Sequence, residues 1–392
     1  MAEPKVRFKR DDGCSYPAWA KQTVGEMTVE LTDYKPLGCG LPLLTSSRTG
    51  LMFQDEYRGK TSTDNEDTLF SVVPRGAVTY RHMSDDDIFH FNINDLVDAG
   101  LVSKEYPVFN TVNRNNIRLL VEYLNSSNKF LEFCKAQKKG GTRTRLYFKV
   151  LKDFELMFPC VEEQQKIADF LSSVDEVITA SEEEVANWET QKKAVMKKIF
   201  SQEVRFKRAD GSDFPEWEEK VFTDVAQLIN GRAYSADEML ASGKYMILRV
   251  GNLFSNNEYY YSDMELDDDK YIDEGDLIYA WSATFGPRIY HGEKCIYHYH
   301  IWKVIPYSVE KDYFLHFLYA DVDNLQSELN GGTMKHITKE IMEKRIVPLP
   351  CKEEQHLIAD FLSDFNEAIT AAKKELELWK ELKKGLLQQM FV

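Results

Sequence analysis

The sequence lacks an apolar run of 18 residues, which excludes a membrane-spanning helix. Its first residues, MAEPKVRFKRDDG, contain no apolar core of the kind that a secretion signal needs. Its six cysteines form no CxxC pair and no evident disulfide framework. We therefore expect a globular, cytoplasmic protein with reduced thiols.

Excess positive charge is also lacking, because the formal net charge is −15. The first 161 residues are nearly balanced, with 22 basic and 21 acidic side chains, and the remainder is acidic. A protein that binds DNA alone usually has a broad basic surface. If this chain binds DNA, we expect it to use local basic clusters together with basic partner subunits.

Motifs of catalysis are absent or incomplete. Gly59-Lys60-Thr61 resembles the end of a phosphate-binding loop, but Gln54 occupies the position where that motif needs glycine. Glu218-Glu219-Lys220 resembles the end of a nuclease motif without its upstream acid. There is no Asn-Pro-Pro, Asp-Pro-Pro or GxGxxG sequence. The sequence therefore predicts no catalytic centre in this chain.

One cluster has the residue types of a metal site: His291, Cys295, His298 and His300. If residues 295–305 form a strand, then His298 and His300 lie on the same face. The aromatic residues between them favour a packed strand instead. We expect no bound metal, and a metal-dependent hydrolase built on these histidines is the least favoured function.

The most informative positive feature is an internal repeat. Residues 159–200 and 350–391 align at a constant offset of 191, and 20 of the 42 pairs are identical. A second repeat begins each half, as VRFKRDDGCSYPAW from Val6 and VRFKRADGSDFPEW from Val204. The period is too long for a solenoid. It indicates a duplicated domain, with a long helix at the end of each copy.

Both repeated helices contain a heptad pattern, in which apolar residues recur at alternating spacings of four and three. This pattern is typical of helices that wrap around one another, and we expect the two to pack antiparallel. The predicted seam residues are Ile167, Leu171, Val174, Ile178, Val185 and Trp188 in the first helix, and Ile358, Leu362, Phe365, Ile369, Leu376 and Trp379 in the second.

Two lysines, Lys192 and Lys383, interrupt the seam at equivalent positions. One interpretation is that their aliphatic stems lie along the seam and their ammonium groups reach water. The other is that a polar interruption sets the register of the two helices. At the start of each helix, Pro159 and Pro350 precede Glu-Glu pairs that suit a helix N-terminus.

The remaining segments are of mixed α/β character, so the predicted fold class is α+β. We expect a first globular domain at 1–158, a helix at 159–203, a second domain at 204–349 and a final helix at 350–392. The expected strands are Lys244–Val250, Asp276–Ala280, Cys295–Ile305, Val72–Tyr80 and Leu146–Val150, and the expected short helices are Ile117–Leu124 and Tyr313–Leu318.

A Gly-Gly-Thr turn precedes the helix region in both halves, at 140–142 and 331–333, with basic residues around it. Such a turn lets the backbone approach a phosphate closely, and the flanking cations neutralise its charge. An ordinary solvated turn is the alternative. The candidate DNA contacts from this pattern are Lys138, Lys139, Arg143, Arg145, Lys149, Lys335, His336 and Lys339.

The doubled motif EEQQKIADFLSSVDE and EEQHLIADFLSDFNE, with its preceding proline and GGT turn, resembles the specificity subunits of Type I restriction–modification systems. The FPEW opening and the run KYMILRVGNL…EGDLIYAWSATFGP are similar to the same family. The resemblance covers essentially the whole chain. It implies two target recognition domains joined by an antiparallel coiled coil with pseudo-two-fold symmetry, and one domain for each half of a bipartite double-stranded DNA site.

The resemblance also implies a subunit without a catalytic centre, whose helices set the separation of the half-sites and dock two methyltransferase subunits. Restriction subunits join the larger complex. S-adenosylmethionine, ATP and magnesium are then bound by partners, and this chain binds no cofactor. Arg249, Asn252 and Arg288, in or beside the matched run, are further expected DNA contacts. The alternative function is a coiled-coil scaffold that does not bind DNA.

Overall fold

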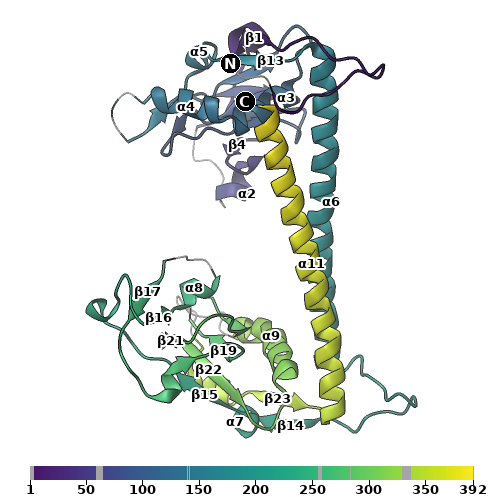
Figure 1. The fold of residues 1–392 in the computed structure, drawn as a ribbon, viewed down its shortest axis with the longest axis vertical. Coiled ribbons are helices and arrows are strands. Elements are labelled where there is room, and N and C mark those ends of the chain that lie inside the picture. Colours follow the sequence, from purple (N-terminus) through teal and green to yellow (C-terminus); the bar gives the residue numbers. More distant parts are fainter. Residues whose placement is uncertain are drawn as a thin grey trace. The chain divides into compact units, whose positions relative to one another are not determined.

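A computed structural model describes residues 4–58, 65–138, 140, 142–254, 258–282, 284–328 and 337–391. The chain forms two compact units. Unit 1 contains residues 1–182 and 374–392, and unit 2 contains residues 183–373. Each unit therefore combines one globular segment with parts of both long helices (Figure 1). Within the described ranges, no helix combines the length and the apolar character needed to cross a membrane.

The long helices are α6 (Val161–Phe200) and α11 (Lys352–Met390). Acidic residues lie in the first turn of each, and Lys197 and Lys198 lie in the last turn of α6, where they complement the helix dipole. Pro159 also contributes directly to the start of α6, because its carbonyl accepts a hydrogen bond from the Gln164 side chain at 2.9 Å.

The two helices run antiparallel in each unit. In unit 1, Asp175 contacts Lys383 and Glu182 contacts Lys380, so later residues of α6 meet earlier residues of α11. Unit 2 shows the same order, from Glu189 with Lys373 to Lys192 with Asn366. This arrangement, with mixed α/β segments beside the helices, confirms the predicted fold class.

The predicted seam positions are buried or half-buried along both helices. Ile167, Leu171 and Val174 are buried in unit 1, and Ile358 and Leu362 are buried in unit 2. The half-buried positions include Trp188 and Phe365, whose rings meet edge to face at 5.9 Å between centroids.

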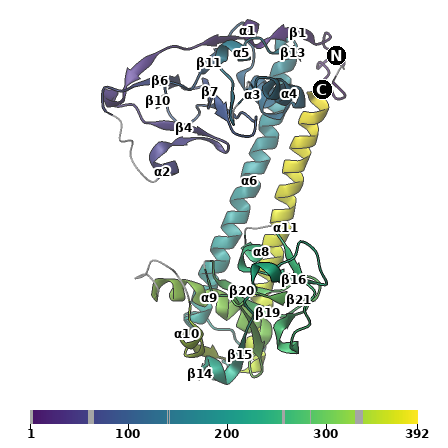
Figure 2. The ribbon, with the colours of Figure 1, turned by 90° about the vertical axis from the view of Figure 1, so that its left-hand side faces the viewer.

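Unit 1 contains small antiparallel sheets, and α3 lies between them and the helix pair (Figure 2). Its larger sheets have the strand orders β10-β6-β3 and β2-β11-β7-β9. Its elements before α6 are β1 (Ala20–Thr23), α1 (Val24–Met27), β2 (Thr28–Glu30), β3 (Tyr34–Pro36), β4 (Leu44–Ser47), β5 (Gly50–Phe53), α2 (Gln54–Arg58), β6 (Leu69–Pro74), β7 (Val78–Tyr80), β8 (Met83–Ser84), β9 (Phe91–Ile93), β10 (Ala99–Val102), β11 (Val108–Thr111), α3 (Ile117–Ser126), α4 (Asn128–Ala136), β12 (Thr144–Arg145), α5 (Phe148–Leu151) and β13 (Glu155–Phe158).

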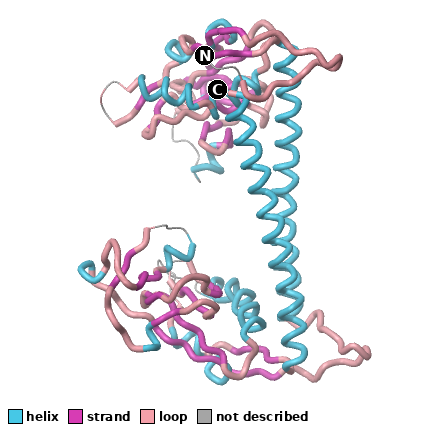
Figure 3. Tube along the Cα trace, viewed as in Figure 1, coloured by secondary structure: helices cyan, strands magenta, loops and turns pink. Residues whose placement is uncertain are grey.

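Unit 2 contains two four-stranded sheets, with the orders β15-β22-β19-β20 and β17-β16-β21-β18. Figure 3 shows strands in magenta and helices in cyan. Strands β16 and β21 pair in parallel, whereas the named strands of unit 1 pair antiparallel. Its elements are β14 (Glu218–Val221), α7 (Phe222–Val225), β15 (Ala226–Asn230), β16 (Tyr245–Leu248), α8 (Val250–Phe254), β17 (Tyr260–Ser262), β18 (Tyr271–Ile272), β19 (Leu277–Ala280), β20 (Gly286–Ile289), β21 (Cys295–Tyr297), β22 (Ile301–Pro306), α9 (Lys311–Glu328), α10 (Lys339–Glu343) and β23 (Ile346–Leu349).

Three sequence-based predictions of strands needed correction. The predicted strand Val72–Tyr80 is divided into β6 and β7 by a turn that contains Gly76 at φ 79°. Cys295–Ile305 is likewise divided into β21 and β22. The prediction for Leu146–Val150 was wrong, because this segment enters the short helix α5, whose buried Phe148 and Leu151 have helical spacing.

Candidate nucleic-acid interface

The predicted basic residues of unit 1 gather around the β8–β12 pair. Arg143 Nε donates to Asp85 Oδ1 at 2.7 Å, and Lys138 Nζ lies 3.5 Å from Asp87 Oδ1. The Arg143–Asp85 pair is largely exposed, whereas the Asp87 side chain is only 19% exposed. Because exposed ion pairs contribute only about 0–1 kcal/mol, replacing the aspartate partner of Arg143 with a phosphate would cost little free energy.

An acidic run, Asp85–Asp87, lies opposite these cations. Asp86 accepts from Arg48 at 2.6 Å, and hydrogen bonds from Ser84 and then Arg48 lower the pKa of the Asp86 carboxyl. Asp87 accepts a hydrogen bond from the Thr144 hydroxyl. The run places acidic charge beside these cations, which a count of lysines and arginines near the turn did not indicate.

Arg145 and Lys149 lie beside an aromatic stack in the same unit. The Lys149 ammonium is 5.8 Å from the ring centroid of Tyr147, and that ring stacks on His82 at 5.2 Å. Tyr147 is exposed and His82 is buried, and burial lowers the pKa of His82. A cation next to an exposed aromatic face suits contact with a nucleic acid.

In unit 2, the predicted residues Arg249, Asn252 and Arg288 gather around α8. The Arg249 guanidinium lies over the Tyr260 ring at 4.4 Å, and Arg288 lies over the ring of Phe254, the last residue of α8, at 4.6 Å. Asn252 Oδ1 accepts from the Arg249 backbone N–H at 3.0 Å. The sequence placed Arg249 and Asn252 in one run, and the structure brings Arg288 to the same helix.

The other predicted contacts of unit 2 are less informative. Lys339 begins α10 and lies 3.5 Å from Glu343 one turn later. Lys335, His336 and the second Gly-Gly-Thr turn lie outside the described residues, as does Lys139 of unit 1. The rejected loop Gly59–Thr61 also lies outside them.

A cleft of about 1400 Å³ opens in unit 2 where α6, α9, β20 and α11 meet. Its lining contains six lysine or arginine side chains and four carboxylates, which makes the cleft basic within an acidic chain. Arg288 and the seam residue Lys192 were singled out from the sequence, but the cleft was not predictable, since α6 and α9 are far apart in the sequence. The six cations are Lys192, Lys193, Lys197, Arg288, Arg345 and Lys373.

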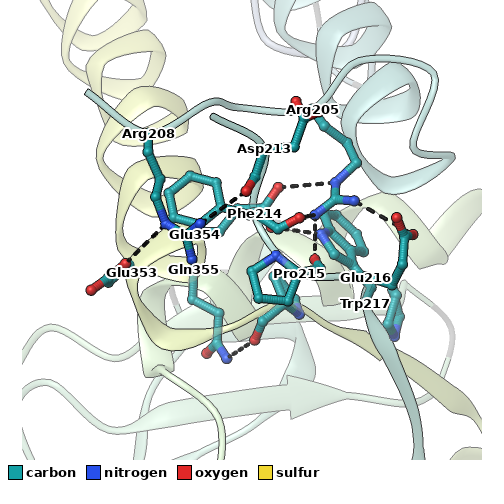
Figure 4. Close-up of polar contacts among 12 residues, drawn as sticks. Arg205, Arg208, Asp213, Phe214, Pro215, Glu216, Trp217, Glu353, Glu354 and Gln355 are labelled. Atoms are coloured by element: carbon teal, nitrogen blue, oxygen red, sulfur yellow. Dashed lines mark hydrogen bonds and ion pairs between the residues drawn. The ribbon is translucent and has the colours of Figure 1, made fainter. Parts of the chain in front are cut away.

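An anchor of three side chains fixes the start of each long helix. In unit 2, fully buried Glu354 accepts from Arg205 at 3.0 Å and 3.3 Å and from the Trp217 indole at 2.9 Å (Figure 4). Arg205 also donates to the Pro215 carbonyl at 2.6 Å. The two N–H-donating side chains balance a carboxylate that would otherwise be costly to bury.

Unit 1 repeats this anchor with the same chemistry. Glu163 accepts from Arg7 at 2.7 Å and 3.2 Å and from Trp19 at 3.0 Å, and it too is fully buried. In each half, the repeated VRF and PAW/PEW motifs therefore attach the N-terminal hairpin to the long helix at the C-terminal end of that half. These motifs and the Glu-Glu pairs are visible in the sequence, but from the sequence the glutamates were assigned only to the helix N-terminus.

The histidines considered as metal ligands contact other side chains. His291 Nδ1 lies 2.7 Å from Glu274, and Cys295 is buried. The rings of His298 and His300 are 4.8 Å apart, and burial lowers the pKa of His298 to about 4. In the described part of the chain, no group of three or more potential metal ligands comes together.

Comparison with known proteins gives a consistent result. The family model for the Type I restriction modification DNA specificity domain matches residues 73–187 and 215–378. The MjaVIII specificity subunit of a Type I restriction enzyme from Methanocaldococcus jannaschii is 26% identical over 289 residues, which cover 68% of each chain. The putative MjaX specificity subunit from the same organism is 28% identical over 60% of this chain and 58% of its own length.

Solved structures show the same fold at low sequence identity. A chain from a study of the assembly and conformational transition of the type I R-M system aligns with a TM-score of 0.57 at 16% identity, over 96% of this chain and 98% of its own. The S subunit of a Type I restriction-modification system from M. genitalium aligns with a TM-score of 0.52 at 14% identity, over 100% and 99%.

Proposed function

The chain belongs to the family of Type I restriction–modification DNA specificity subunits, and from this premise we propose that it recognises a bipartite DNA site for such a complex. It has two target recognition domains, one in each unit. We propose that each domain reads one half-site and that the chain has no catalytic centre of its own.

One observation supports this proposal most directly. The two units share the same anchor and long helix, but the sheets attached to them differ. The anchor and the long helix are the same in both units, from Arg7, Trp19 and Glu163 to Arg205, Trp217 and Glu354. The sheets attached to them differ, because the larger sheets of unit 1 have three and four strands, whereas unit 2 has two sheets of four strands each. A bipartite target with unlike halves needs such a design.

Candidate contacts to DNA occur in both units. Unit 1 offers Arg143, Arg145 and Lys149, and unit 2 offers Arg249 and Arg288. Contacts to phosphate position a protein on the duplex, and contacts to base edges supply specificity. Because the whole chain carries a net charge of −15, we infer that basic partner subunits contribute to affinity.

We further propose that two methyltransferase subunits and, in the larger complex, restriction subunits assemble on this chain. The duplicated frame supports this, since two equivalent surfaces suit two copies of one partner. S-adenosylmethionine, ATP and magnesium would be bound by those partners, and this chain would bind no cofactor.

The test is a footprint of the complex formed by this chain and its methyltransferase subunit. We expect protection of two short segments separated by an unread spacer, with affinity that falls steeply as salt rises. An intact complex that protects no specific sequence would contradict the proposal and support the scaffold alternative.

A further inference from the structure

Two lysines at equivalent positions of the repeat have different surroundings. Lys383 in α11 follows Lys192 in α6 by the repeat offset of 191. In unit 1, the Lys383 ammonium lies 2.8 Å from Glu122 Oε1 and 2.8 Å from Asp175 Oδ1. Its charge is therefore balanced by two carboxylates.

In unit 2, the positions equivalent to Asp175 and Glu122 carry no carboxylate. Asn366 stands 191 residues after Asp175, and its Oδ1 accepts from Lys192 Nζ at 2.5 Å. The residue equivalent to Glu122 is His316, as two contacts shared by the units show. In each unit, the backbone N–H six residues before this position bonds to a glutamine of one long helix, and the ring one residue after it meets the phenylalanine at the end of the other long helix. The contacts are Asn116 with Gln164, Glu310 with Gln355, Tyr123 with Phe391 and Phe317 with Phe200.

The replacement by His316 leaves the charge of Lys192 unbalanced. His316 is fully buried, and burial together with the nearby Lys192 charge lowers its pKa to about 4, so it is neutral at pH 7. Lys192 Nζ lies 5.6 Å from the ring centroid of Tyr319. As far as the described chain extends, no carboxylate lies within 4 Å of the Lys192 ammonium.

Lys192 lines the basic cleft of unit 2 together with Lys197, Arg288 and Tyr319. Burial raises the pKa of Tyr319, and the charge of Arg288 opposes this rise, so Tyr319 is close to both Lys192 and Arg288. The Arg288 Nε is buried and has no hydrogen-bond partner among the residues that the structure describes. Arg288 therefore has an unused hydrogen-bond donor, and Lys192 has an unbalanced charge.

The other cations of the cleft are already paired. Salt bridges join Lys193 to Asp323, Lys373 to Glu189 and Arg345 to Asp321. Among the residues that the structure describes, neither Lys197 nor Arg288 forms an ion pair. The unpaired positive charge of the cleft is therefore on Lys192, Lys197 and Arg288. Among the described lining residues, Glu219 is the one carboxylate that forms no ion pair.

We propose that this cleft binds a phosphate group of the DNA backbone through Lys192, Lys197 and Arg288. The inference rests on the proposed function and names a phosphate contact that unit 1 does not have. DNA is favoured as the source of the anion because Phe254 and Arg288 connect the cleft to α8, which follows Arg249 and contains Asn252. A duplex read by those residues brings its backbone to the cleft.

Two variants remove the free charge by opposite routes. In the double variant His316→Glu and Asn366→Asp, unit 2 acquires the carboxylates that neutralise Lys383 in unit 1. In Lys192→Met, the ammonium itself is removed while the aliphatic stem is kept. The control, Gln191→Glu with Gln388→Glu, adds two negative charges at exposed positions of the same helices outside the cleft.

The assay measures binding of the complex with methyltransferase to a duplex that carries the site and to one that lacks it, over a range of salt. Each test variant should reduce the slope of log affinity against log salt by roughly 1 on both duplexes. The loss of affinity between 50 and 200 mM salt should then be about fourfold smaller than for the natural chain. The preference for the site should be unchanged, and the control should keep the original slope.

Two results would overturn the inference. An unchanged salt slope in both test variants, with the complex intact, would show that the cleft does not contact DNA. Failure of the variants to assemble with methyltransferase would instead identify an acidic protein surface as the occupant. If the natural complex itself shows no site preference, then the proposed function fails, and that result is distinct from both.

Discussion

Buried Glu163 and Glu354 determine how each recognition domain is attached to its long helix. Each carboxylate accepts hydrogen bonds from the N–H groups of an arginine and a tryptophan. Both belong to a hairpin that lies more than a hundred residues away in the sequence. A buried carboxylate without such donors is strongly destabilising. The anchor therefore couples the folding of the hairpin to the folding of the helix.

At this scale we predict that Glu354→Gln lowers the free energy of unfolding of unit 2 by about 2–3 kcal/mol. The amide keeps the shape of the side chain but loses the charge that binds Arg205, and it presents N–H groups where only acceptors fit. Hydrogen exchange of the unit 2 amides measures the effect. Glu353→Gln, at the exposed neighbouring position, is the matched control and should change stability by less than about 0.5 kcal/mol.

Glu163→Gln should have the equivalent effect on unit 1, because its anchor has the same contacts. Loss of protection that is equal in Glu353→Gln and Glu354→Gln would contradict the role of the buried carboxylate. The residue types of the anchor were visible in the repeated motifs. Their contact was not predictable, since it depends on how a distant hairpin folds back onto the helix.

The surroundings of Lys192 and Lys383 could not be predicted from the sequence either. One interpretation placed both ammonium groups in water, and the other gave both the same role in register. The structure shows two different environments, since Lys383 pairs with two carboxylates and Lys192 with an amide. Equivalent positions in a repeat need not have equivalent chemistry when their neighbours have diverged.

Among the elements, the two long helices were the most predictable. Their heptad spacing persists over many turns, and α6 and α11 begin within two residues of the repeated prolines. The short elements were less predictable, because a few apolar residues in a row suit either a strand or a helical turn. Leu146–Val150 is the example, since packing of Phe148 and Leu151 selects a helix there.

At the scale of elements, we predict that lengthening both helices lengthens the spacer of the DNA site. Four residues inserted after Glu182 in α6 and four after Lys373 in α11 fall where the two units meet in the sequence. Each insertion adds about 6 Å of helix, close to two base pairs. We expect methylation of the same half-sites with about two more base pairs between them.

Mapping of methylated sites measures this change. The added residues also rotate the helix by about 40° beyond a full turn, so a four-residue and a seven-residue insertion should be compared. Methylation that persists only at the original spacing would show that the helices do not set the spacing, and would leave them as docking surfaces.

At the scale of the whole molecule, the chain combines one shared frame with two divergent domains. This organisation could be predicted from the sequence, because the repeated segments recur at constant spacing between the divergent ones. The residues that read bases could not be predicted, because that depends on which side chains reach a groove of the duplex. The same organisation implies that one domain can be exchanged without altering the half-site read by the other.

The most direct test of this claim is a map of methylated DNA sites before and after residues 6–157 are replaced by the equivalent segment of a relative with a known target. The anchor residue Glu163 and both long helices are kept in this exchange. We predict a bipartite site for the natural chain, and for the exchanged chain a site in which one half is the relative's and the other is unchanged. Methylation of a site altered in both halves, by a complex that remains assembled, would contradict one reader per domain.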